Sequence, residues 1–191
     1  MMKSLLRKIL YKFSYFNICK ETQGTAAPVG IWDIICYRFF KHKTGIYWPV
    51  HVSSKVSSPQ NIEIGIGTAP GLSPGCYIQG IGGVKIGDYT IIAPNVGIIS
   101  ANHDVYNFEE HKCQSVQIGD YCWIGMNSVV LPGSRLGERT IVAACSVVKG
   151  DFSHGFCVLA GNPARIVKFL DREKCVNHVN RFEYLGFLKK V

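Results

Sequence analysis

Three features are absent from or scarce in this sequence of 191 residues, and each argues against a class of protein. No run of 18 apolar residues occurs, so no segment is long enough to cross a membrane as a helix. The eight cysteines form no C-x-x-C pair, which argues against a disulfide framework. Charged residues make up only 18% of the chain against 47% hydrophobic residues, a balance that excludes an intrinsically disordered protein.

Acidic residues are also few, since 13 Asp and Glu face 21 Lys and Arg and leave a net charge of +8. This excess favours a polyanionic or phosphorylated partner without choosing among them. The basic residues gather at the two ends of the chain and no nucleic-acid motif accompanies them, so no nucleic-acid partner is expected. Arg7, Lys8 and Lys12 interrupt what would be the apolar core of a signal peptide, and a cytoplasmic location is expected.

An aliphatic residue recurs every six positions along much of the chain. The regular positions are Ile86, Ile92, Ile98, Ile118, Ile124, Val130, Leu136, Val142 and Val148. A small residue follows most of them four places later, at Thr90, Val96, Cys122, Ser128, Ser134, Thr140 and Ser146. A less regular stretch with the same pattern precedes them, from Ile66 to Ile78.

A period of six fits neither a helix of 3.6 residues per turn nor an alternating strand followed by a hairpin. It predicts a mainly β fold, a parallel β-helix in which three hexapeptide faces complete a coil of about 18 residues. The aliphatic residue points into the prism and the small residue fits the corner, so that these positions align in stacked coils. Cys76 and Cys122 occupy small-residue positions and are expected to be buried.

The repeat is interrupted once. Ile86 and Ile118 are 32 positions apart, which is one coil of about 18 residues and a surplus of about 14. The surplus is polar and aromatic and predicts an extruded loop over residues 104–117. Loops on a rigid scaffold often carry binding and catalytic residues.

The two ends of the chain do not follow the repeat, and helices are expected there. Residues 1–49 are expected to form a helical region, with a basic amphipathic helix over 2–19 and a short helix over 31–41. The first helix could pack on the solenoid or a neighbouring subunit, or could touch the inner face of a membrane. The β-helix is expected over 50–163, and a helical cap over 164–191, with the helix itself from Ile166 to Lys190.

Several motifs within residues 60–170 are typical of one enzyme family. They are Ile86-Gly87-Asp88, Ala93-Pro94-Asn95-Val96, Asn102-His103-Asp104, Trp123-Ile124-Gly125 and Gly161-Asn162-Pro163-Ala164-Arg165. With these motifs the sequence resembles the hexapeptide-repeat acyltransferases, left-handed parallel β-helix enzymes that use acetyl-CoA. Within that family it is most similar to the polysaccharide O-acetyltransferases and the maltose and galactoside acetyltransferases. The resemblance implies a homotrimer with sites at the subunit boundaries.

The resemblance also implies catalytic residues. The histidine ten residues after the Ala of Ala93-Pro94-Asn95 is the family's general base, and here it is His103. A sugar hydroxyl is a poor nucleophile until a base takes its proton, and a near-neutral imidazole suits that task. Asp104 is expected to orient or tune His103, with Glu109 and Glu110 as competitors for that role.

Acetyl-CoA is the expected co-substrate, and no metal is expected. Positions that match the family's path for the pantetheine arm and the nucleotide phosphates are Trp123, Gly125, Met126, Ala144, Lys149, Arg165 and Lys168. Small residues would let the arm lie close, and the cations would bind phosphate. Lys149 stands one position earlier than the family's usual lysine.

The acceptor side departs from the family pattern. Sugar acetyltransferases place an asparagine near the acceptor in the coil before Ile86, and this chain has none there. Tyr77, Gln79 and His111 are the candidate acceptor contacts instead. The acceptor is expected to be a hydroxyl of a sugar or of a polysaccharide precursor.

Three alternatives stay open. The acceptor could be the amine of an amino sugar, which would make the protein an N-acetyltransferase. The solenoid could be a non-catalytic assembly module. It could also be a zinc carbonic anhydrase, which needs about three histidines on neighbouring coils, whereas His103 alone of the six histidines is placed on a regular coil of that region.

Overall fold

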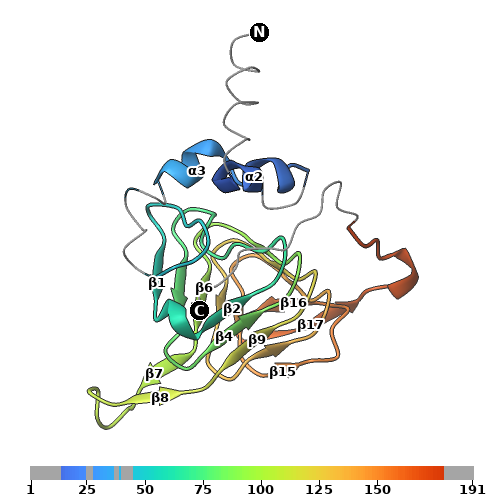
Figure 1. Cartoon of the computed structure of the whole chain (residues 1–191). Helices are drawn as coiled ribbons and strands as arrows, with labels where there is room; N and C mark the ends of the chain where they lie inside the picture. The colour runs from blue at the N-terminus through green and yellow to red at the C-terminus, as the bar shows by residue number, and fades with distance from the viewer. Residues whose placement is uncertain (1–13, 25–27, 37–38, 40–44, 179–191) are drawn as a thin grey trace.

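The computed structural model describes residues 14–24, 28–36, 39 and 45–178. Its body is a triangular prism of stacked coils, with two helices above the first coil and a hairpin projecting from one side (Figure 1). The coils run as three parallel sheets, as expected for a left-handed parallel β-helix. The predicted fold class is therefore confirmed.

Each face of the prism is one five-stranded sheet. Face A contains β1 (Lys55–Ser57), β3 (Tyr77–Gln79), β6 (Gly97–Ile99), β11 (Val129–Val130) and β14 (Val147–Val148). Face B contains β2 (Ile62–Ile64), β4 (Val84–Ile86), β9 (Val116–Ile118), β12 (Arg135–Leu136) and β15 (Asp151–Phe152). Face C contains β5 (Ile91–Ile92), β10 (Trp123–Ile124), β13 (Ile141–Val142), β16 (Cys157–Gly161) and β17 (Ala164–Phe169).

The strand register confirms the hexapeptide repeat. Ile86 pairs with Ile118, and Ile118 pairs with Leu136, so the insertion lies where the sequence arithmetic places it. The predicted aliphatic residues from Ile86 to Val148 are at most 7% exposed and form one continuous core. Burial of these aliphatic side chains is the main source of stability in the solenoid.

The small residues at the corners have a second role besides their size. The Thr90 hydroxyl donates to the carbonyl of Gly119 in the next coil (2.8 Å) and accepts from the N–H of Cys122 (3.1 Å). Ser128 does the same with the carbonyl of Ala143 and the N–H of Ser146. A hydroxyl at this position therefore satisfies two buried backbone groups between coils.

Cys76 and Cys122 are each 1% exposed, which confirms the expected burial of both thiols. Burial raises the pKa of the Cys122 thiol to about 12. All eight cysteines of the chain lie in the described residues, and they form no disulfide there.

The N-terminal helices cover the first coil. They are α2 (Ser14–Glu21) and α3 (Ile31–Cys36), and Cys19, Val29 and Ile34 pack together against Leu72 of the solenoid. Of the expected second helix over 31–41, the first part is present as α3 (Ile31–Cys36), and residues 37–38 and 40–41 lie outside the described residues. Most of the expected amphipathic helix over 2–19 lies outside the described residues. In the part of the chain that the structure describes, no helix combines the length and the hydrophobicity needed to cross a membrane.

The expected C-terminal helix is wrong over the described part of that segment. Residues from Ala164 to Phe169 form β17, which pairs antiparallel with β16 on face C, and a 3₁₀ turn follows at Arg172–Lys174. Ile166, Val167 and Phe169 have high strand propensity, and the free edge of β16 supplies hydrogen-bond partners. Residues 179–191 lie outside the described residues.

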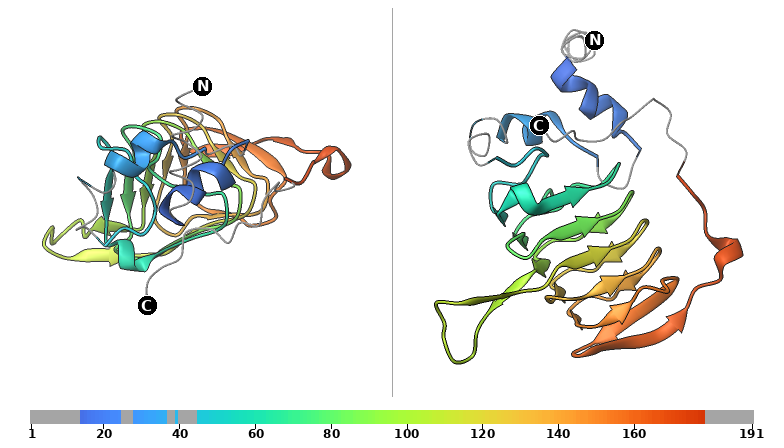
Figure 2. Two further views of the ribbon diagram at one scale, coloured as in Figure 1. Left: turned by 45° about the horizontal axis from the view of Figure 1, so that its top comes forward. Right: turned by 60° about the horizontal axis from the view of Figure 1, so that its bottom comes forward.

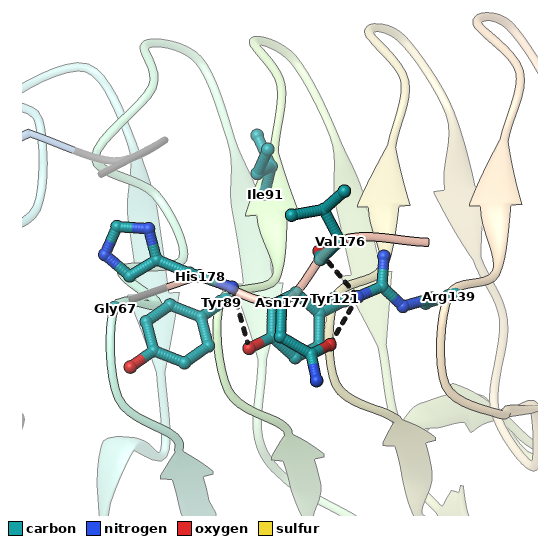
Figure 3. A pocket seen from close by; sticks show the side chains of 8 residues that line it. All are labelled: Gly67, Tyr89, Ile91, Tyr121, Arg139, Val176, Asn177 and His178. Atoms are coloured by element: carbon teal, nitrogen blue, oxygen red, sulfur yellow. Dashed lines mark hydrogen bonds between the residues drawn. The ribbon is translucent and has the colours of Figure 1, made fainter. Parts of the chain in front are cut away.

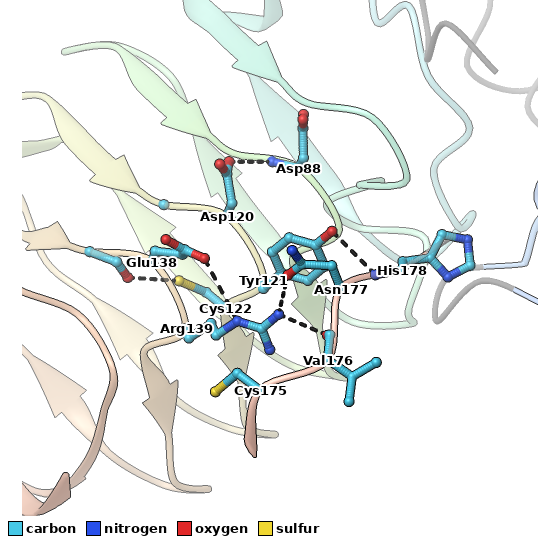
Figure 4. A network of polar contacts seen from close by, with 12 residues as sticks. Asp88, Asp120, Tyr121, Cys122, Glu138, Arg139, Cys175, Val176, Asn177 and His178 are labelled. Atoms are coloured by element: carbon cyan, nitrogen blue, oxygen red, sulfur yellow. Dashed lines mark hydrogen bonds and ion pairs between the residues drawn. The ribbon is translucent and has the colours of Figure 1, made fainter. Parts of the chain in front are cut away.

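Residues 170–178, here called the strap, return along the corner between faces B and C toward the helices (Figure 2). Arg139 donates from Nη2 to the carbonyl of Val176 (2.8 Å) and to Oδ1 of Asn177 (2.7 Å), and its guanidinium lies 4.5 Å from the ring centre of Tyr121 (Figure 4). The N–H of His178 donates to the hydroxyl of Tyr121. Arg139 is therefore the main side-chain anchor of the strap.

Replacing Arg139 with alanine is expected to free the strap, because two hydrogen bonds to a charged group and a cation–π contact are lost. Limited trypsin digestion should cut after Lys174 several-fold faster in Arg139→Ala than in the unmodified protein. Arg135→Ala is the matched control, since Arg135 is exposed on face B and does not contact the strap. Equal cleavage rates in both variants would show that Arg139 does not hold this segment.

Candidate active site

The projecting hairpin is inserted at the corner between faces A and B. Its strands are β7 (Ala101–His103) and β8 (His111–Cys113), which pair antiparallel with His103 opposite His111. Val116 and Ile118 already belong to β9 on face B, so the excursion starts and ends earlier than the expected 104–117. The hairpin begins at Ala101, before the expected loop, and its second strand ends at Cys113, and the polar composition of the insertion did not indicate these two strands.

The hairpin holds His103 in a defined tautomer. Nδ1 of His103 lies 2.5 Å from the carbonyl oxygen of Phe108, five residues later in the same hairpin. A carbonyl oxygen accepts hydrogen bonds and cannot donate them, so Nδ1 carries the proton in the neutral imidazole. Nε2 then keeps the lone pair that a general base needs, on an exposed side chain.

Asp104 does not contact His103 in this way. Its carboxylate forms an ion pair with Lys112 across the hairpin and accepts from the N–H groups of Tyr106 (2.7 Å) and Asn107 (3.1 Å). The Lys112 hydrogen bond, supported by the Tyr106 N–H, lowers the pKa of Asp104 below its ordinary 3.8. The group that contacts His103 Nδ1 is therefore the Phe108 carbonyl and not the expected Asp104, whose carboxylate stabilises the turn of the hairpin.

Asp104→Asn should loosen the hairpin at neutral pH, since the amide keeps the turn but loses the ion pair. Because the folded-state pKa is depressed, the stabilisation is present above pH 3.8 and is lost as the pH falls through the folded value. Hydrogen exchange of hairpin peptides should be a few-fold faster in Asp104→Asn than in the unmodified protein at pH 7, and the difference should vanish as the pH falls through the lowered folded-state pKa of Asp104. Lys112→Met, which removes the same pair, is the companion variant; a difference that persists in acid would refute the ion pair as its cause.

The three expected acceptor contacts occupy different environments. His111 is exposed, and its ring centre lies 4.5 Å from that of His103, so it flanks the candidate base directly. Tyr77 is 37% exposed on the outer side of face A, one coil earlier. Gln79 is only 9% exposed, and its Oε1 accepts a hydrogen bond from the N–H of Ala101 at the hairpin root.

The residues expected to line the CoA path lie at the corner between faces C and A. Trp123 is 50% exposed on face C, and Met126 and Ala144 are exposed neighbours on successive coils at the corner. Gly125 is a glycine for a structural reason, since a Cβ there would lie 2.6 Å from the carbonyl oxygen of Val142 in the next coil. A surface with a short side chain at Ala144 beside apolar Met126 and Trp123 fits a thin apolar arm.

The expected phosphate contacts lie on the last coils. Arg165 and Lys168 are exposed on β17 at the edge of face C. Lys149 is exposed at the other side of the last coil, at the corner between faces A and B. The first two cations share face C with Trp123, whereas Lys149 does not, as its early position in the sequence suggested.

Within one chain, face A separates His103 from the expected CoA path. Six residues of extended chain span about 20 Å, and the hairpin and Met126 lie at opposite edges of this face. A single chain therefore does not bring the two groups of expected residues together.

The outer surfaces of the three faces differ in polarity. Face B carries the exposed ladder Glu63, Lys85, Gln117, Arg135 and Asp151. Face A instead carries Lys55, Tyr77, Gly97, Val129 and Val147, and face C carries Ile91, Trp123, Ile141 and Val158. Beyond Lys55 these two adjoining outer ladders carry no charged residue, and largely apolar faces are suited to contact with other chains.

A hollow of about 390 Å³ lies under the strap, at the corner between faces B and C. Tyr89, Tyr121, Arg139 and His178 surround it, and Ile91 of face C closes one side (Figure 3). It lies away from the hairpin and belongs to the docking of the strap. Among the described residues, no three His, Cys, Asp or Glu side chains gather as a metal site requires.

Sequence reasoning missed two contributors to the site. Phe108 supplies only its backbone carbonyl to His103, so its residue type carries no signal. The second contributor is the glycine-rich segment Gly80-Ile81-Gly82-Gly83, which lies against the root of the hairpin. The N–H of Gly82 donates to Ser100 Oγ (2.9 Å), and a Cβ on Gly82 would collide with the Ser100 carbonyl. Paired glycines in front of an insertion are the signal that could have indicated this close approach.

The fold and hairpin together define a hexapeptide β-helix with one exposed, tautomer-fixed histidine. A family model described as bacterial transferase hexapeptide (six repeats) matches residues 115–150. The chain is 34% identical over 110 residues to a putative lipopolysaccharide biosynthesis O-acetyl transferase, WbbJ, of Escherichia coli K12, covering 51% of this chain and 56% of the relative.

Solved structures show the same similarity. A galactoside acetyltransferase in complex with coenzyme A matches with a TM-score of 0.60 and 26% identity, covering 73% of this chain and 70% of that one. A maltose O-acetyltransferase from Clostridium difficile 630 matches with a TM-score of 0.53 and 27% identity, covering 64% and 66%. These matches confirm the expected resemblance to the hexapeptide-repeat acetyltransferases. The chain spans about half the length of the curated relatives it matches.

Proposed function

We propose that this protein is an acetyl-CoA-dependent O-acetyltransferase that acts on a hydroxyl of a sugar or polysaccharide precursor. The observation that carries the proposal is His103, an exposed imidazole whose Nδ1 is fixed by the Phe108 carbonyl and whose Nε2 is free to accept a proton. Its place on a hexapeptide solenoid similar to galactoside and maltose acetyltransferases supports the reaction class.

In the proposed mechanism, Nε2 of His103 takes the proton of the acceptor hydroxyl as the oxygen attacks the thioester carbonyl carbon. The Phe108 carbonyl stabilises the imidazolium that forms, because it accepts from Nδ1–H. When the tetrahedral adduct collapses, the C–S bond breaks and His103 returns the proton to the departing thiolate. General acid–base catalysis of this kind contributes about 10²–10⁴-fold. A backbone N–H near the hairpin root would stabilise the oxyanion.

Acetyl-CoA supplies the activated acyl group, and the residues at the corner of faces C and A fit it. Trp123, Met126 and Ala144 offer an apolar surface for the pantetheine arm, and Arg165 and Lys168 offer charge for the phosphates. Lys149 lies off this line and is a weaker candidate.

A homotrimer is part of the proposal. The separation of His103 from the CoA residues within one chain is bridged if face A of one subunit meets face C of the next. The apolar outer ladders of these two faces support such packing. Light scattering should give three times the chain mass of 21.2 kDa. A monomer at micromolar concentration would contradict a shared site.

The last part of the proposal is that the protein is cytoplasmic and that its N-terminal segment contacts the anionic inner face of a membrane. Trp32 of α3, the helix that packs with α2, is 75% exposed and supports it. Liposome flotation with and without residues 1–20 tests it, and equal flotation would remove it. If the N-terminal segment does bind membranes, a lipid-linked glycan would be a suitable acceptor.

The test of the reaction is thiol release from acetyl-CoA over a panel of free sugars, amino sugars and oligosaccharides, with product mass measured. Acceptor-dependent release with one added acetyl group on oxygen supports the proposal. Acetylation on nitrogen would instead establish the N-acetyltransferase alternative, and no release with any acceptor would favour an assembly module. Exposed Cys113 and Cys145 require a protein-only blank in a thiol assay.

A further inference from the structure

We infer that Gln79 is a positioning residue for His103, acting through the root of the hairpin rather than on the acceptor. This inference rests on the proposed function. Gln79 is the last residue of β3 on face A, and its neighbour Ile78 is fully buried in the prism. The Gln79 side chain therefore leaves the prism on the outer side, yet only 9% of the residue is exposed. Its Oε1 accepts the N–H of Ala101, the first residue of β7, at 2.8 Å.

The neighbouring contacts make Gln79 part of a group of residues that holds the root of the hairpin. This group, here called the seat, consists of Gln79, Gly82 and Ser100. Ser100 Oγ donates to the backbone carbonyl of Gln79 (2.6 Å) and accepts from the N–H of Gly82 (2.9 Å). On the returning side, the N–H of Gln114 donates to the Ser100 carbonyl (2.9 Å). The N–H of Val116, after the hairpin, donates to the carbonyl of Gly83 (3.0 Å), so the coil before the insertion contacts the chain on both sides of the hairpin, and the Gln79 amide is the side chain that bonds to β7.

The hairpin depends on this seat for its direction. A two-stranded ribbon is marginally stable alone, and β7 and β8 pair with each other but with no face of the prism. Ala101 and His103 lie two residues apart on the same strand, so they point to the same side of the ribbon. A change in the tilt of Ala101 therefore moves His103 with it.

Small displacements of a general base have large effects, since about 1 Å of misplacement can cost about 100-fold in rate. Gln79→Met keeps the length and unbranched shape of the side chain but leaves the Ala101 N–H without its acceptor. We expect kcat to fall about 10- to 100-fold, with the KM values for acetyl-CoA and acceptor within about twofold of the unmodified protein.

Two further variants complete the experiment. Gln79→Glu retains an oxygen that accepts from Ala101 and should restore most of the kcat. Gln117→Met is the matched control, because Gln117 is exposed on face B and should leave both constants unchanged. Should Gln79→Met not fold, Gln79→Asn, whose amide is one methylene short of Ala101, takes its place.

The outcomes are distinguishable. An unchanged kcat in Gln79→Met would overturn the inference, and so would a raised acceptor KM with normal kcat, which would make Gln79 an acceptor contact. If the unmodified protein acetylates nothing, the proposed function fails separately. Hydrogen exchange of peptides covering 101–113 then tests the seat alone: faster exchange in Gln79→Met than in Gln79→Glu supports it, and equal exchange refutes it.

Discussion

Replacing His103 with alanine is expected to lower the rate of acetyl transfer by about 10²–10⁴-fold, the range that general acid–base catalysis contributes. The residual rate would come from holding the two substrates together. Binding of acetyl-CoA should change little, because the proposed contacts to its pantetheine arm and phosphates come from other side chains, among them Trp123, Met126 and Arg165. The measurement is kcat with an acceptor identified in the panel, together with acetyl-CoA affinity by calorimetry.

His154→Ala is the matched control, since His154 is an exposed histidine on the last coil, beside Phe169 and away from the hairpin. Circular dichroism should be identical in both variants. If His103→Ala turned over at near the unmodified rate, the proposed base would have to be abandoned.

Ile124→Ala is expected to cost about 2–5 kcal/mol in the free energy of unfolding. Ile124 is 0% exposed and is paired in register with Ile92 and Val142, so its loss leaves a cavity within the continuous aliphatic core. The rigid stacking of coils on both sides limits how far the site can collapse. Chemical denaturation monitored by circular dichroism gives the value.

Arg135→Ala on face B serves as the control and should change stability by no more than about 0.5 kcal/mol, because Arg135 is exposed. Equal stability of Ile124→Ala and Arg135→Ala would contradict an interior built on the hexapeptide aliphatic positions.

The aliphatic period could be read from the sequence because burial selects residue type strongly. Ile86, Ile118 and Leu136 align in register as the period requires. The corner conformations could not be read in the same way. Tyr89, Tyr121 and Arg139 adopt positive φ, a region where glycine or asparagine would be expected, because the geometry of the coil imposes the corner whatever the side chain.

The C-terminal segment shows tertiary context overriding a local pattern. Ile166 and the residues after it suggested a helix, but β16 offers an unpaired strand edge and the segment pairs with it as β17. Strand partners from Gly161, paired with Ala164, to Cys157, paired with Phe169, compete with helical hydrogen bonds, and the apolar spacing alone does not decide between the two structures.

The candidate site was predictable where it depends on side chains and not where it depends on backbone. The loop position and the motif around Ala93-Pro94-Asn95 indicated His103. The tautomer of His103 is fixed by the backbone carbonyl of Phe108, and a backbone group cannot be predicted from the residue type at that position. For Gln79 the structure shows a hydrogen bond to Ala101, a contact between coils that sequence spacing could not anticipate because the insertion hides the register.

The most direct test of the proposed function is a structure of the protein with CoA and the acceptor identified in the panel. We expect the CoA thiol at a boundary between two chains, with the acceptor hydroxyl within about 3 Å of Nε2 of His103. A thiol bound far from the hairpin of every chain, or a His103 ring turned away from the acceptor, would contradict His103 as the base.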